Sequence, residues 1–242
     1  MVITTNEQAL LAGRAPMAIT INEQALLKLL LLTSPALPVG AFSYSEGLET
    51  LVAHRHLTDR LTLKHWLLQE LRYGGVRLDV AIATRTHHNF HTPDQLNYWN
   101  HWLTASRDTA ELRQQSWQMG RALVRLGQSL HPELKTSFSH CDTPCNFAVA
   151  FSIIAAHWQI DTHTMALGYL QSWAANLIGA AVKLVPLGQT EGQRCLLELI
   201  PDLRTAAETS VALKDDELYV SGWGSAIASM QHETLYTRLF RS

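Results

Sequence analysis

Hydrophobic residues recur at helical spacing along most of this chain of 242 residues. From Ser106 to Leu130, large apolar side chains alternate with Arg, Gln and Glu every three or four positions, which predicts a long amphipathic helix. The segments Phe147 to His157 and Thr164 to Val185 are far more apolar and rich in Ala and Gly, which predicts central helices. Runs of β-branched residues with period two are absent from the sequence. We therefore expect an all-α fold, a single helical bundle-like domain of about eight to ten helices with an apolar C-terminal tail.

The first helix of this domain is expected soon after Thr20. Thr20 and Glu23 have the spacing of a capping box, and Leu26, Leu29 and Leu30 would supply its core-facing side. A second start signal lies at residues 92–95, Thr-Pro-Asp-Gln. Irregular connections are expected at residues 34–43, 137–144 and 214–225.

A short duplication marks the N-terminus, where residues 3–11 recur almost unchanged as residues 19–27. A single short echo is not a repeat architecture, and only the second copy, which follows Met17, continues into an apolar helix. We interpret residues 1–16 as a dispensable extension and residues 17–242 as the folded domain.

Composition points towards an interaction protein. Hydrophobic residues make up 47% of the chain and charged residues only 17%, so apolar surface is available for another protein. The formal net charge of -2 lacks the basic excess of a nucleic-acid-binding protein. No apolar run reaches the roughly 20 residues that cross a membrane. Three cysteines, an odd number, favour a reducing compartment and a cytoplasmic location.

Motifs for catalysis or cofactor binding are missing from the sequence. It contains neither a phosphate-binding P-loop nor a G-x-S-x-G nucleophile motif, so we assign no catalytic and no cofactor-binding residues. His87 and His91 could share a helical face, and Cys141 with Cys145 could offer soft metal ligands beside His140. Surface histidines and a buried thiol pair explain these residues better, so we assign no metal site either.

Glu49 follows an unusual segment rich in Pro, Gly and Ser. Its residue type and position fit an ordinary acid on a helix surface, so we expect Glu49→Ala to leave the melting temperature nearly unchanged.

Four stretches together carry a recognisable pattern: residues 34–49 (SPALPVGAFSYSEGLE), 107–121, 181–194 and 232–242. In this order and spacing they resemble the F-type urease accessory proteins, the UreF family, and the likeness covers residues 18–242. The resemblance implies an all-α homodimeric adaptor without catalytic activity. It would bind the D/H-type urease accessory protein and recruit the accessory GTPase (G-type), and the assembly would deliver nickel to apo-urease. The family further suggests Glu49, Lys183 and Arg238 for partner contact and modulation of the GTPase.

The segment from 222 to 242 is the expected partner-docking tail. Residues 222–224 (Gly-Trp-Gly) are predicted to be a hinge, and Leu235 and Leu239, with Tyr236 and Phe240 one step on, would form an apolar helical face. Periodicity alone fits packing onto the domain equally well, and the resemblance favours docking. The predicted partner-binding residues are therefore Glu49, Lys183, Tyr236, Arg238, Leu239 and Phe240. An alternative function, a helical nickel-binding chaperone or metalloenzyme that uses His87, His91, Cys141 and Cys145, stays open at this point.

Overall fold

The computed structural model describes residues 22–142 and 144–242. These residues form eleven α-helices, two 3-10 helices and no strand, which confirms the all-α fold with one helix more than expected. No helix among them is long and apolar enough to cross a membrane. The proposed extension, residues 1–16, lies outside the described residues. The elements are α2 (Glu23–Leu32), η1 (Ala41–Ser43), α3 (Leu48–Ala53), α4 (Arg60–Tyr73), α5 (Gly75–His88), α6 (Pro93–Ala105), α7 (Ala110–Leu130), α8 (Leu134–Ser139), α9 (Phe147–His157), α10 (Thr162–Leu184), α11 (Gln189–Val211), η2 (Asp215–Glu217) and α12 (Trp223–His232).

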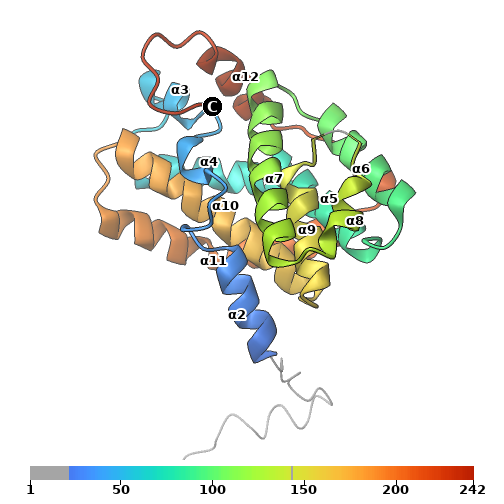
Figure 1. The fold of residues 1–242 in the computed structure, drawn as a ribbon. Coiled ribbons are helices and arrows are strands. Elements are labelled where there is room, and N and C mark those ends of the chain that lie inside the picture. Colours follow the sequence, from blue (N-terminus) through green and yellow to red (C-terminus); the bar gives the residue numbers. More distant parts are fainter. Residues whose placement is uncertain (1–21, 143) are drawn as a thin grey trace, which may run out of the picture.

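Helix α9 lies at the centre of the bundle, as its apolar sequence predicted. It spans the predicted residues Phe147–His157, and its nine consecutive residues from Ala148 to Ala156 are buried. It packs against α5 and α7, while α10 packs against α5 and α11 (Figure 1). A helix that is apolar all round can be stable only when neighbours cover every side, which this position provides.

Helix α7 confirms the predicted long amphipathic helix and is one of the longest, with 21 residues. The Thr109 hydroxyl caps its start by accepting the N–H of Leu112 at 3.2 Å. At Gly120 the backbone of α7 lies very close to the backbone of Cys145, so that a Cβ on residue 120 would be 1.9 Å from the Cys145 carbonyl oxygen. Glycine at this position therefore lets the segment that leads into α9 pack directly on α7.

Helix α2 differs from its prediction. Leu26 and Leu30, expected in the core, are exposed, and Leu29 and Leu32 are the buried residues. The physical reason is that α2 projects from the body and meets it mainly through α10 (Figure 1). Thr20, the expected cap, lies outside the described residues, and the Asn22 side chain caps the helix by accepting the N–H groups of Gln24 and Ala25.

The end of the molecule opposite α2 carries α3, α12 and the chain terminus (Figure 1). Helices α3 and α12 pack together there. Gly47 permits this contact in two ways: its φ of 83° is left-handed, and a Cβ would lie 3.0 Å from that of Ala228. The predicted hinge at residues 222–224 is wrong, because α12 begins at Trp223. The two ends of the sequence pattern, residues 34–49 and 232–242, thus meet in space.

Candidate partner-binding surface around the C-terminal tail

The tail, residues 233–242, is not helical beyond α12. The predicted helical face through Leu235, Tyr236, Leu239 and Phe240 is therefore wrong. The reason lies in its backbone partners, which belong to the segment 43–49 instead of to the tail itself. The N–H of Arg241 donates to the carbonyl of Ser43 at 2.9 Å, and the N–H and hydroxyl of Ser45 both donate to the carbonyl of Ser242 at 2.6 Å. These bonds hold the tail against the loop that precedes α3.

Glu49, in the first turn of α3, is buried, with 7% of its surface exposed. Its Oε1 accepts the N–H of Leu239 at 2.6 Å and its Oε2 accepts the N–H of Phe240 at 2.9 Å. The expectation of an exposed surface acid is therefore wrong. Glu49 belongs to the contact between the tail and its own domain, and any effect it has on a partner passes through that contact.

His232, the last residue of α12, lies beside Glu49 and is fully buried. Its Nε2 is 3.3 Å from Oε2 of Glu49, and its Nδ1 is 2.8 Å from Oε2 of Glu111 in the first turn of α7. The other oxygen of Glu111 accepts Nη1 of Arg238 at 3.1 Å. We call Glu49, Glu111, His232 and Arg238 the His232 cluster. Sequence reasoning missed His232 and Glu111, since no local spacing signals a contact between residues this far apart.

The remaining predicted residues lie around the same tail. Phe240 is buried, and the ammonium of the exposed Lys183 lies 5.7 Å from the centre of its ring. Tyr236 is fully exposed and Leu239 is 65% exposed. The structure therefore brings all six predicted residues to one region of the molecule and divides them into two groups. Glu49 and Phe240 anchor the tail, whereas Lys183, Tyr236, Arg238 and Leu239 face solvent.

Helix α12 adds an apolar surface that the sequence analysis did not resolve. Trp223, Ile227 and Met230 are exposed and recur at i, i+4 and i+7, so they share one side of the helix. The helical spacing of these three residues could have predicted this apolar surface. It was overlooked because residues 222–224 were predicted to be a hinge and not the start of a helix.

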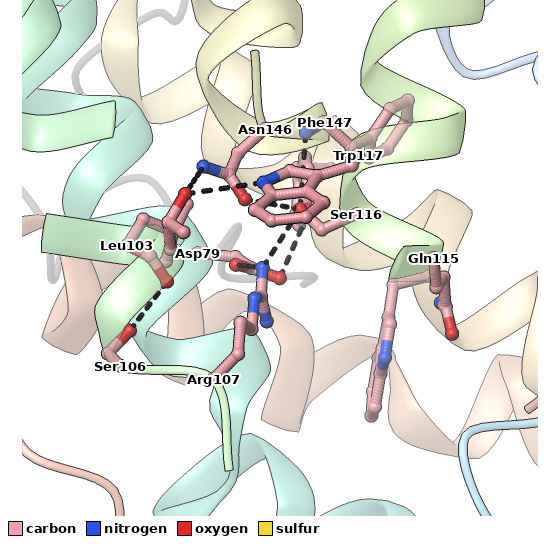
Figure 2. Close-up of polar contacts among 12 residues, drawn as sticks. Asp79, Leu103, Ser106, Arg107, Gln115, Ser116, Trp117, Asn146 and Phe147 are labelled. Carbon is pink, nitrogen blue, oxygen red and sulfur yellow. Dashed lines mark hydrogen bonds and ion pairs between the residues drawn. The ribbon is translucent and has the colours of Figure 1, made fainter. Parts of the chain in front are cut away.

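A buried polar network positions the helices beneath this surface and explains the second motif. Arg107, in the loop before α7, forms an ion pair with Asp79 of α5 (Figure 2). The hydroxyl of Tyr169 of α10 also donates to Asp79, at 3.1 Å. Ser116 of α7 donates to Oδ1 of Asn146 at 2.9 Å (Figure 2). Burial raises the pKa of Asp79 above its ordinary value, although Arg107 and Tyr169 act to lower it.

A cavity of about 290 Å³ adjoins this network and is lined by acidic residues as well as apolar ones. Glu46, Glu70 and Asp79 contribute carboxyl groups to its wall. Burial raises the pKa of Glu46, and it raises the pKa of Glu70 to about 8, so that Glu70 is mostly protonated at neutral pH.

The histidines and cysteines considered as metal ligands have other partners. Nε2 of His87 lies 2.7 Å from the carbonyl of Ile160, which makes it a donor, and His91 is exposed against the ring of Phe90. Cys141 and Cys145 are free thiols, and their mutual contact together with burial raises the pKa of Cys145 well above its ordinary value. Within the described residues neither set belongs to a group of three candidate metal ligands, and such a group occurs elsewhere.

That group is His131, Glu133 and His157, whose candidate ligand atoms lie 3.1 to 3.3 Å apart. The indole N–H of Trp158 donates to Nε2 of His131 at 2.8 Å, which places the proton of a neutral imidazole on Nδ1. That nitrogen then donates to Glu133 and has no lone pair for a metal. A metal-bound histidine has the opposite arrangement, with its second nitrogen as donor. The polar atoms of this group satisfy one another without an ion.

Comparisons with known proteins agree with the four motifs. The family model UreF matches residues 57–200. The chain is 51% identical over 226 residues to the urease accessory protein UreF of Trichormus variabilis, covering 93% of this chain and 99% of that protein. It is 52% identical over 225 residues to the protein of that name from Nostoc sp., covering 92% and 98%. Identity to the one from Pseudoalteromonas translucida is 38% over 225 residues, covering 91% and 96%. With more than half of its length matched and relatives aligned nearly end to end, this chain belongs to the UreF family of urease accessory proteins.

Proposed function

We propose that this chain is a non-catalytic adaptor in urease maturation, acting in the cytoplasm as a homodimer. Its tail binds the D/H-type urease accessory protein, and the resulting complex recruits the accessory GTPase, so that nickel is delivered to apo-urease. As an adaptor it contributes binding energy that holds other proteins in one geometry, which raises the effective concentration of nickel donor near acceptor.

The exposed apolar side chains on an anchored backbone are the observation that carries this proposal. The side chains of Tyr236 and Leu239 are exposed to solvent, although Glu49 and the buried Phe240 hold the backbone of the tail in place. A pre-ordered segment loses less conformational entropy on binding, and aromatic anchors contribute strongly at interfaces. The exposed side of α12, with Trp223 and Ile227, adds apolar surface to the same docking region.

Lys183 and Arg238 supply the charged part of this proposed surface. Lys183 is exposed beside Phe240, and the Arg238 side chain is 44% exposed while it pairs with Glu111. Exposed charges at an interface set orientation and association rate more than affinity. We assign Lys183 to contact with the GTPase-bearing complex and Arg238 to the rim of the tail.

Removal of residues 233–242 tests the proposal. The shortened chain is expected to keep its helical circular dichroism and to lose co-purification with the D/H-type partner, with Arg238→Ala weakening assembly less. Leu239→Ala provides a finer variant, and Leu197→Ala on α11 is its matched control because both leucines are 65% exposed. Unchanged affinity of the shortened chain would refute docking through the tail, and aggregation would show that the tail belongs to the core.

A further inference from the structure

His232 connects the two carboxylates that hold the tail. Glu49 receives two backbone N–H groups of the tail, and Glu111 receives the guanidinium of Arg238. The imidazole of His232 lies between these acids, with one nitrogen facing each of them. The three side chains come from three separate helices, α3, α7 and α12. Both acids that contact the tail are therefore also in contact with the buried imidazole of His232.

Charge explains why this imidazole matters. An ionised carboxylate can only accept hydrogen bonds, so when both acids are ionised His232 must donate at both nitrogens. Without such a bridge, two acids of low exposure would face each other across a small gap, and like charges in a poorly solvated site repel strongly. The side chains of Glu49 and Glu111 are only 9% and 14% exposed, and of these two acids the guanidinium of Arg238 pairs with Glu111 alone.

Hydrogen bonds nearby fix α12 in the position that this bridge requires. Ser229, three residues before His232, shares a 2.8 Å hydrogen bond with Thr109, the cap of α7. Gly47 lets α3 approach the same part of α12. The imidazole is thus held by packing and hydrogen bonds on both sides, independently of the tail.

We propose that His232, acting with Glu111, is a positioning residue for the partner-binding tail. It keeps Glu49 and Glu111 together; Glu49 fixes the backbone at Leu239 and Phe240 and Glu111 holds the Arg238 side chain, so that Tyr236 and Leu239 point outward. This inference rests on the proposed function, because the tail is taken to be the docking segment. It assigns a role to two residues that do not themselves face the partner.

The expected effect on affinity follows from the population of the ordered tail. A protein whose binding-competent state is only partly populated binds with an affinity reduced by that fraction. If loss of the bridge lowers the ordered population to about one tenth, the apparent dissociation constant for the partner rises about tenfold. A residue that touches the partner directly would weaken binding without changing the order of the free tail.

His232→Gln is the test variant, because a glutamine amide of similar reach can donate from its nitrogen only. The matched control is His87→Gln, which removes a half-buried histidine in the last turn of α5, where Nε2 lies 2.7 Å from the carbonyl of Ile160. The contact variant is Leu239→Ala. Two quantities are measured on the full chain: hydrogen exchange of the Leu239 and Phe240 amides, and the dissociation constant for the D/H-type accessory protein.

His232→Gln should bring exchange at both amides close to the rate of unprotected amides and weaken binding about tenfold, while the α9 amides stay protected. Leu239→Ala should weaken binding with the Phe240 amide still protected, and His87→Gln should change neither quantity. Tail amides that stay protected in His232→Gln, or that open without loss of affinity, would overturn the positioning role. If the unaltered chain does not bind the partner, the proposed function fails and this inference fails with it. If the unaltered chain and His232→Gln bind the partner equally well, the proposed function stands and only the positioning role fails.

Discussion

The carboxylate of Glu49 accepts the backbone N–H of Phe240 at 2.9 Å and so joins the first sequence motif to the last. The two residues lie 191 positions apart in the chain. Their contact gives a physical reason for the two motifs to occur together, because the tail has a fixed path only when the acid is present to receive its backbone. It also changes what a substitution at Glu49 should do.

Glu49→Ala should lower stability instead of leaving it unchanged as the sequence suggested. The substitution leaves two backbone N–H groups and His232 without their acceptor, and unsatisfied groups of this kind cost about 1–3 kcal/mol. The measurement is thermal unfolding, together with carboxypeptidase digestion of the tail. Both a lower melting temperature and faster release of the terminal residues are expected. An unchanged melting temperature with an intact tail would mean that the contact contributes nothing in solution.

Removing Arg107 should destabilise the fold strongly. Its partner Asp79 has a side chain only 11% exposed, and the loss of one member of a buried ion pair costs about 3–5 kcal/mol. Arg107→Met keeps the length of the side chain while removing its charge. We expect the double variant with Asp79→Asn to be less destabilised than the sum of the two single variants, as determined from urea unfolding. Simple additivity would show that the pair does not interact.

Much of the fold could be predicted because local pattern and tertiary role agree in this chain. The apolar run of α9 marks a helix that neighbours cover on all sides, and its ends were predicted to the residue. Helix α2 shows the limit of the same reasoning. Its leucines indicate a helix, but periodicity says nothing about whether a second layer covers Leu26 and Leu30, and the structure leaves both exposed.

The candidate site was predicted as a set of residues but not as an arrangement. Resemblance to a family pointed to Glu49, and the apolar spacing of the tail pointed to Phe240; neither signal revealed that both side chains are buried. The helical spacing of Leu235 and Leu239 was misleading, because the hydrogen bonds that the tail backbone donates to Glu49 and accepts from Ser45 outweigh a local preference for helix. His232 and Glu111 were missed since only the folded chain brings α7 and α12 together.

Glu70 should make stability depend on pH. Burial raises its pKa in the folded chain to about 8, against an ordinary value of 4.5. Between these values the folded state keeps a proton that the unfolded state has lost, so this group's contribution is full below 4.5 and is lost as the pH rises through 8. The expected slope is about 1.4 kcal/mol per pH unit at most.

Glu70→Gln removes this titration and isolates it, since every other group remains in both chains. The free energy of unfolding is compared between variant and unaltered chain from pH 5 to pH 8. We expect the variant to gain stability relative to the unaltered chain as the pH rises. A constant difference over this range would show that Glu70 is not titrating with a raised pKa.

Trp158 should suppress metal binding at His131, Glu133 and His157. Its indole N–H occupies Nε2 of His131, so Nδ1 carries the proton and cannot coordinate. Trp158→Phe removes the donor and keeps an aromatic ring, which frees the proton to move to Nε2 and leaves Nδ1 as a ligand. A hydrogen bond of this kind contributes about 1–1.5 kcal/mol, so Trp158→Phe should bind nickel about tenfold more tightly in calorimetric titration.

Adding His157→Ala to Trp158→Phe should abolish the gain, because the site then loses a second nitrogen ligand. Tight stoichiometric binding by the unaltered chain that His157→Ala removes would show instead that Trp158 does not hold the proton, and would revive the nickel-chaperone alternative at this group.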